Sequence, residues 1–136
     1  MQKNSKGLTL MEITIVLAIM AIIALIVVPI FFTTTDRARL RADIQSARVI
    51  QNAIDLHRVE RGYHAEGGTN ISELIENLSE VGYINARNIT VQTDSADWVV
   101  DSTVGIMVDI SSSPSEIYEA YLSLPADERR YVRSGR

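Results

Sequence analysis

One segment decides most of what this chain of 136 residues can fold into: residues 8–32 contain a single ionisable side chain, Glu12. The hydrocarbon core of a bilayer is about 30 Å thick and requires about 20 helical residues to cross. Residues 8–32 are therefore long enough to span a membrane as a helix. A charged side chain in hydrocarbon costs at least a few kcal/mol, so such residues are rare and usually functional. Glu12 therefore needs an explanation.

The charges on either side of this segment predict its orientation. Lys3 and Lys6 precede it without any acid, whereas the whole chain carries a net charge of −4. Because basic residues stay on the cytoplasmic side, we expect the N-terminus in the cytoplasm and residues from Thr33 onward outside it. The acidic balance disfavours a general nucleic-acid binder. The chain has no cysteine, which excludes disulfides and thiolate metal sites.

An ordinary secretory signal does not explain the segment. Such a signal has an apolar stretch of about 7–15 residues followed by small residues at a cleavage site, and neither feature is present here. A plain signal anchor that tethers an extracytoplasmic sensor or binding domain remains open. That alternative gives no reason for an acid at position 12 or for Gly7 at the junction of polar and apolar sequence.

The stretch KGLTLMEITIVLAIMAIIALIVVP resembles the N-terminus of type IV pilins and of the pseudopilins of type II secretion and competence systems. The family pattern is a short basic leader ending in Gly, a hydrophobic residue, Thr-Leu, an apolar residue and Glu. Lys6-Gly7, Leu8, Thr9-Leu10, Met11 and Glu12 match it. Leu8 stands where Phe is commonest, which the family tolerates. Pro29 falls where many pilins carry a helix-bending proline.

The resemblance implies a processing and assembly route. A prepilin peptidase would cut between Gly7 and Leu8, and the new amine of Leu8 would be methylated. The N-terminal helix, with Thr9, Glu12 and Pro29 in it, would then pack into a filament core. There Glu12 would neutralise the Leu8 amine of a neighbouring subunit.

The resemblance also implies partners and a location. The partners would be other pilin subunits, the prepilin peptidase, the inner-membrane assembly platform and, before assembly, membrane lipid. DNA would be a partner only of a competence pilin. The protein would be a single-pass membrane protein before assembly and an extracellular or periplasmic filament afterwards.

The helix is expected to continue beyond the membrane segment as an amphipathic helix. Arg61-Gly62 is a plausible end, with a cation in the last turn and a glycine after it. Pro29 should bend the helix or melt it locally. Apolar residues follow three- and four-residue spacing, and charged residues including Asp43 occupy most of the other positions; the apolar residues are Leu40, Ile44, Ala47, Ile50 and Ile54.

The remainder predicts a small head. A short helix capped by Asn70 or Ser72 should run to about Val81 and end at Gly82. Strands are expected at 89–93, 98–101 and 104–110, and residues 117–124 form either a helix or a strand. The expected fold is thus α+β, with a long N-terminal helix packed against a small antiparallel sheet. The expected boundaries are a leader at 1–7, a helix at 8–35 that spans the membrane or lies in a filament core, and an amphipathic helix at 36–62. A globular head at 63–125 and a flexible tail at 126–136 follow.

Catalytic and metal-binding patterns are absent from the sequence. His57 and His64 are seven residues apart, whereas helical metal pairs lie four apart with an acid nearby. Asp94, Asp97 and Asp101 are better explained as a solvated turn than as a calcium site. We therefore expect neither an enzyme, nor a cofactor, nor a metal.

Overall fold

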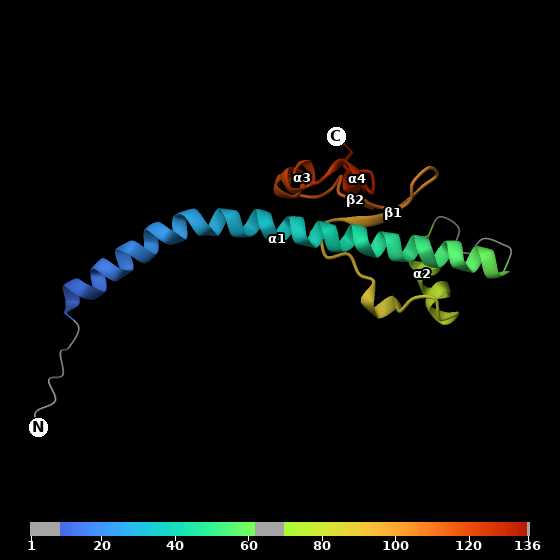
Figure 1. Cartoon of the computed structure of the whole chain (residues 1–136), viewed down its shortest axis with the longest axis horizontal. Helices are drawn as coiled ribbons and strands as arrows, with labels where there is room; N and C mark the ends of the chain where they lie inside the picture. The colour runs from blue at the N-terminus through green and yellow to red at the C-terminus, as the bar shows by residue number, and fades with distance from the viewer. Residues whose placement is uncertain (1–8, 62–69, 136) are drawn as a thin grey trace, which may run out of the picture. The chain divides into compact units, whose positions relative to one another are not determined.

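The computed structural model describes residues 9–61 and 70–135. Its dominant element is one α-helix of 52 residues, α1 (Leu10–Arg61), as Figure 1 shows. The helix predicted to end at Arg61 is therefore confirmed from Leu10 onward. The contacts divide the chain into two units, one up to Phe32 and one from Thr33 onward, and α1 contributes to both.

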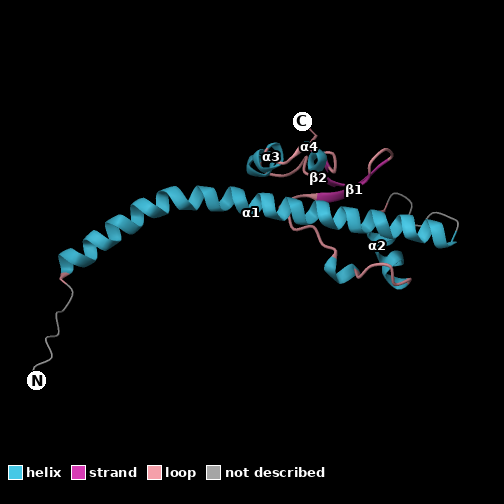
Figure 2. Ribbon diagram, in the orientation of Figure 1, coloured by secondary structure: helices cyan, strands magenta, loops and turns pink. Residues whose placement is uncertain are grey.

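The unit from Thr33 onward is an α+β head built on the second part of α1, as predicted. Figure 2 shows its helices and strands. They are, in chain order, α2 (Ile71–Glu80), η1 (Ala86–Asn88), β1 (Asp97–Asp101), β2 (Gly105–Asp109), α3 (Ser115–Leu122), α4 (Ala126–Arg129) and β3 (Val132–Arg133). The residues at 117–124 thus form the helical alternative, α3.

The sheet is mixed, which differs from the expected antiparallel sheet. β1 and β2 form an antiparallel pair in which Trp98 lies opposite Val108. β3 adds to β2 in parallel, with Val108 opposite Val132. A parallel pair needs a crossover connection, and here α3 and α4 supply it.

α4 and β3 lie within the stretch 126–136, where a flexible tail was expected. Val132 of β3 is buried in the core, and Arg41 of α1 pairs with Glu128 of α4 at 2.9 Å. Tyr131 lies under the guanidinium of Arg48, with 4.6 Å from the Arg48 Cζ to the ring centroid. The apolar pair at 131–132, set among arginines, is what attaches this segment to the head.

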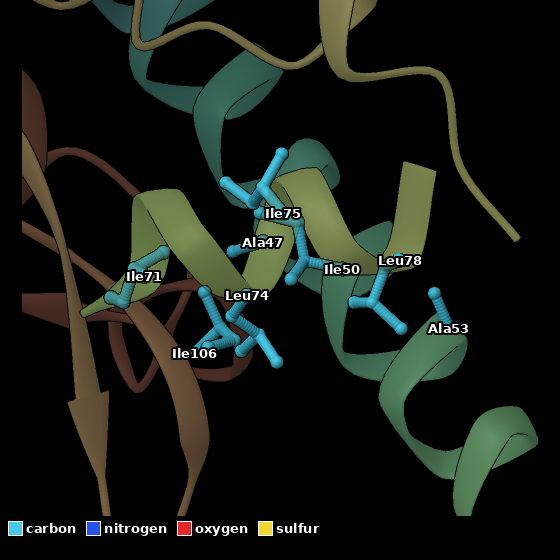
Figure 3. Packing of buried hydrophobic residues seen from close by; sticks show 8 residues of the cluster. All are labelled: Ala47, Ile50, Ala53, Ile71, Leu74, Ile75, Leu78 and Ile106. Atoms are coloured by element: carbon cyan, nitrogen blue, oxygen red, sulfur yellow. The ribbon is translucent and has the colours of Figure 1, made fainter. Parts of the chain in front are cut away.

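The apolar stripe predicted on α1 is confirmed, and it serves two clusters of buried residues. Ala47, Ile50 and Ala53 pack with the apolar face of α2 and with Ile106, as Figure 3 shows. Leu40 and Ile44 pack with β2, α3 and β3. Trp98 packs against both clusters and so joins them.

Asp43 is a charged residue buried in the head. The sequence placed it on a charged face of α1, but its exposed fraction is 0%. Its two carboxylate oxygens accept hydrogen bonds from the backbone N–H groups of Gln92 and Thr93, both at 2.8 Å. A buried carboxylate is tolerated when such donors satisfy it. Asp43 therefore fastens the chain after η1 to α1.

The same bonds account for the missing strand at 89–93. The side chains there alternate as in a strand, with Thr93 buried and Gln92 exposed. The amides of Gln92 and Thr93 are occupied by Asp43 rather than by a neighbouring strand. The segment is not part of the sheet, so the prediction of a strand is wrong.

Local turn chemistry matches the sequence more closely. Asn70 caps α2 by accepting a hydrogen bond from the N–H of Ser72 at 3.1 Å, and Gly82 follows the helix at φ +91°. In the β1–β2 hairpin, Asp101 Oδ1 accepts N–H groups of Thr103 (2.7 Å) and Val104 (3.0 Å). These two donors stabilise the carboxylate and lower the pKa of Asp101 below its usual value.

Gly105 and Gly82 offer a matched pair of glycine-to-alanine variants. Both have φ near +90°, but a Cβ at Gly82 meets nothing within 4 Å, whereas at Gly105 it would lie 2.1 Å from Gln51 Oε1. That oxygen accepts the N–H of Ile106 at 3.2 Å. We expect Gly82→Ala to lower the free energy of unfolding by about 1 kcal/mol through backbone strain alone. Gly105→Ala should lose about 1 kcal/mol more because Gln51 must move away from Ile106.

The fluorescence of Trp98, the sole tryptophan of the sequence, reports unfolding of the head in detergent-solubilised protein. Denaturant midpoints of both glycine variants against the wild type give the two free energies. Equal losses for the two variants would show that the Gln51 contact contributes nothing.

Candidate functional site

The first part of α1 exposes apolar side chains on all its faces. Every residue from Leu10 to Phe32 is exposed, and none of them is part of the core. This part of α1 is long and apolar enough to cross a membrane. An apolar surface of this extent calls for lipid or other protein around it.

Thr9 and Glu12 together start this helix. The Thr9 carbonyl accepts the N–H groups of Glu12 (3.0 Å) and Ile13 (3.2 Å), and Thr9 Oγ1 accepts the Glu12 N–H at 3.2 Å. Thr9 is thus the N-cap and Glu12 the third helical residue. The spacing Thr-x-x-Glu is that of a capping box, in which the hydroxyl of the cap accepts the N–H of the third residue. The signal is present in the sequence, although both residues also belong to the pilin-like pattern.

The position of Glu12 suits a negative charge. A carboxylate in the first turn is favoured by the helix dipole. The Glu12 side chain is exposed and borders a shallow apolar hollow lined by Ile13, Val16 and Leu17. It is the only ionisable side chain between Leu10 and Phe32. A cation brought to this end of the helix would therefore find a single anion in an apolar surface.

Pro29 lies inside α1 and does not end it. Proline has no N–H to donate to the carbonyl four residues earlier, that of Leu25. The helix is nevertheless uninterrupted from Leu10 to Arg61, so local melting at Pro29 is not observed. The other two predicted site residues, Gly7 and Leu8, lie outside the described residues, as does the whole leader at 1–7.

The side chains considered for metal binding have other neighbours. His57 is buried and meets the ring of Tyr83 edge-on, with 5.5 Å between the ring centroids. The Asp94 Oδ2 lies 3.7 Å from Arg39 Nη1, and the Asp101 carboxylate accepts the N–H of Thr103 in its own turn. Within residues 9–61 and 70–135, no group of three or more His, Cys, Asp and Glu side chains could hold a metal ion. His64 lies outside that range.

Tyr83 also ties the head to the end of α1. Its hydroxyl donates a hydrogen bond to the Glu60 carboxylate. This bond favours the neutral phenol and raises the pKa of Tyr83 above its usual value. The contact has a structural role in the head.

Comparison with known proteins identifies the N-terminal segment. The family model described as the prokaryotic N-terminal methylation motif matches residues 2–28. Residues 2–28 therefore carry a prokaryotic N-terminal methylation motif. The resemblance noted in the sequence is thereby confirmed for this segment, which includes Gly7, Leu8, Thr9 and Glu12.

A curated relative supports the same assignment. The chain is 39% identical over 56 residues to "Prepilin peptidase-dependent protein A" of Clostridium perfringens (strain 13 / Type A). The alignment spans 40% of this chain and 40% of that relative. No solved structure matches. Together with the long apolar helix, the motif supports a membrane-anchored protein.

Proposed function

We propose that this chain is a structural subunit of a type IV pilus or pilus-like filament, a pilin or pseudopilin, and not an enzyme. A prepilin peptidase removes residues 1–7 by cutting between Gly7 and Leu8, the amine of Leu8 is methylated, and the mature chain polymerises through its N-terminal helix. One observation supports this proposal most strongly: a helix apolar on all faces carries one carboxylate, Glu12, in its first turn.

The physical basis is the pairing of two charges that are each costly in an apolar filament core. Cleavage creates a cation at Leu8, and Glu12 supplies an anion one turn later in the sequence. An ion pair between neighbouring copies offsets part of both desolvation penalties. Such a pair also fixes how far one subunit is displaced along the axis of the next, as buried polar contacts do in coiled coils.

Before assembly, the same carboxylate is tolerable in the membrane. Glu12 lies at the beginning of the span, where it can reach water or lipid headgroups at the interface. The helix is then anchored with its N-terminus in the cytoplasm and the head outside. The proposed partners are the membrane lipid, the prepilin peptidase, the inner-membrane assembly platform and other pilin subunits.

Mass spectrometry of the protein purified from cells with their own peptidase tests the processing step. We expect the N-terminal residue to be Leu8, carrying one added methyl group. A Gly7→Val variant should retain residues 1–7, because the peptidase backbone can approach closely only a residue without a Cβ. Recovery of uncut wild-type protein would contradict the proposal and favour the alternative, a signal-anchored protein with an extracytoplasmic sensor or binding domain.

A further inference from the structure

A group of arginines gathers where α4 lies against α1 in the head. Figure 1 shows the two helices beside each other, and Arg41 of α1 pairs there with Glu128 of α4. Arg48 extends from α1 two turns after Arg41, and Arg129 and Arg130 stand at the end of α4. The proposed function makes no use of these side chains, because it depends on the first part of α1.

Tyr131 brings two of these cations together. The Cζ atoms of Arg48 and Arg130 lie 4.6 Å and 4.9 Å from the centroid of the Tyr131 ring. The two guanidinium groups are therefore no more than about 10 Å apart, a distance over which exposed charges still interact at moderate salt. The ring attracts each cation, but the two cations repel each other. One aromatic ring thus holds two like charges close together.

No carboxylate forms an ion pair with Arg48 or Arg130 in the part of the chain that the structure describes. Glu128, two residues before Arg130, pairs with Arg41 instead, at 2.9 Å. Asp127 lies one turn before Arg130 and is exposed, but it is not paired with that arginine. The two charges are therefore not neutralised by neighbouring acids.

Partial burial adds to the cost of these charges. The Nε atoms of Arg48 and Arg129 are shielded from water, and neither has a hydrogen-bond acceptor among the described residues. A charge withdrawn from water without a partner is destabilising. An anion bound by the remaining N–H groups would offset this cost and the repulsion between Arg48 and Arg130. A negatively charged ligand would therefore stabilise this arrangement.

The N–H groups that such a ligand needs are available. A cation held over an aromatic ring is attracted by the face of the ring, so the contact does not occupy its donors as an ion pair would. A guanidinium has five N–H donors. Arg130 Nη2 donates one of them to the Tyr131 hydroxyl at 3.0 Å. Arg130 is also exposed, so a ligand can reach it from solvent.

We propose that Arg48 and Arg130, held together by Tyr131, form a binding site for a phosphate group. A carboxylate has two oxygens and one charge, which match a single guanidinium. A phosphate has more oxygens and up to two charges, so it can accept hydrogen bonds from both arginines. The whole chain has a net charge of −4, so a general attraction for anions does not account for such a site. The site belongs to the head and does not depend on filament assembly.

Equilibrium dialysis with radiolabelled inorganic phosphate tests the site on the full chain in non-ionic detergent, at constant ionic strength. We expect the wild type to bind one phosphate per chain and Arg130→Gln to bind it at least about tenfold more weakly. Arg87→Gln is the matched control, because Arg87 is an exposed arginine on η1 and its loss changes the net charge equally. Its affinity should stay within about twofold of the wild type. Absence of saturable binding by the wild type, or equal binding by the two variants, would overturn the proposal.

Arg48→Lys distinguishes a shaped site from a general positive charge. Lysine keeps the charge but lacks the planar fork of donors, so we expect phosphate binding to weaken about fivefold. Arg48 also contacts Tyr131 beside β3, and urea unfolding followed by Trp98 fluorescence therefore checks that the variant is folded. A folded Arg48→Lys variant that binds phosphate as tightly as the wild type would contradict recognition by the guanidinium.

Competition identifies the source of the phosphate group. Detergent micelles that contain phosphatidylglycerol are compared with micelles that contain phosphatidylcholine, whose headgroup has no net charge. Displacement of the labelled phosphate by phosphatidylglycerol alone would support the site and assign it to anionic lipid headgroups. Retention of the label with both lipids would support the site and assign it to soluble phosphate compounds. Equal displacement by both lipids would show that charge does not govern binding and would overturn the proposal.

Discussion

Asp43→Ala is expected to lower the free energy of unfolding of the head by about 3 kcal/mol, because it removes two hydrogen bonds to a buried charged acceptor. The carboxylate is fully buried and accepts the N–H groups of Gln92 and Thr93. Without it, these amides lose their acceptor, and the segment that leads from η1 to β1 loses its attachment to α1. Urea unfolding of detergent-solubilised protein, followed by Trp98 fluorescence, measures the loss.

Asp55→Ala provides the control on the same helix. Asp55 is exposed, and its carboxylate accepts one side-chain hydrogen bond, from Gln51 at 3.1 Å. Its removal should change the free energy of unfolding by no more than about 0.5 kcal/mol. If Asp43→Ala were no more destabilising than Asp55→Ala, Asp43 would not hold the segment in place.

Glu12→Gln is expected to reduce filament assembly by about 100-fold while leaving cleavage and membrane insertion intact. Glutamine is as good as glutamate at the third position of a capping box, so the helix start is preserved. The charge, however, is lost, and the Leu8 amine of the neighbouring subunit is left buried and unpaired, which costs about 3 kcal/mol or more. The measurement is the ratio of sheared polymer to membrane-bound subunit, with cleavage followed by mass spectrometry. Glu12→Leu should behave in the same way.

Two further variants separate the charge from the cap. Glu12→Asp keeps the anion on a side chain shorter by one methylene and should assemble better than Glu12→Gln. Thr9→Val keeps the anion but removes the hydroxyl that accepts the Glu12 N–H. Its expected loss is that of an N-cap, about 1 kcal/mol, and therefore roughly tenfold at most. If Glu12→Gln assembled normally and Thr9→Val did not, helix capping by Thr9, and not charge pairing by Glu12, would control assembly.

The parts of the fold that the sequence predicted are those determined locally. The long apolar run and the stripe of Leu40, Ile44 and Ile50 determine α1 by length and period. Asn70 and Gly82 delimit α2 because capping depends on a few consecutive residues. The β1–β2 hairpin likewise follows from alternation and from the turn residues between Asp101 and Gly105.

The parts that the sequence did not predict depend on distant partners. The amides that bind Asp43 lie 49 and 50 residues further along the chain, so composition alone placed this acid on a polar face. β3 is two residues long and pairs in parallel after a crossover, which no local pattern indicates. Residues 89–93 alternate as a strand does, but they have no strand beside them to pair with.

The residues of the N-terminal site were predicted from the sequence, but the hydrogen bond between Thr9 and Glu12 was not. The pattern from Gly7 to Glu12 indicated the signal that the family model matches at residues 2–28. The same residues also contain the capping spacing of Thr9 and Glu12, which the pilin-like pattern alone does not explain. That spacing places the backbone N–H of Glu12 against the Thr9 hydroxyl, so Thr9 caps the helix whose first turn carries the carboxylate proposed to pair with a neighbour.

The most direct test of this account is a high-resolution map of the polymer formed by the mature chain. The account predicts that the Glu12 carboxylate lies about 3 Å from the Leu8 amine nitrogen of an adjacent subunit, with the helices around it packed without water. A map in which that carboxylate faces solvent, with no amine within hydrogen-bonding distance, would contradict the charge pairing on which the proposed assembly depends.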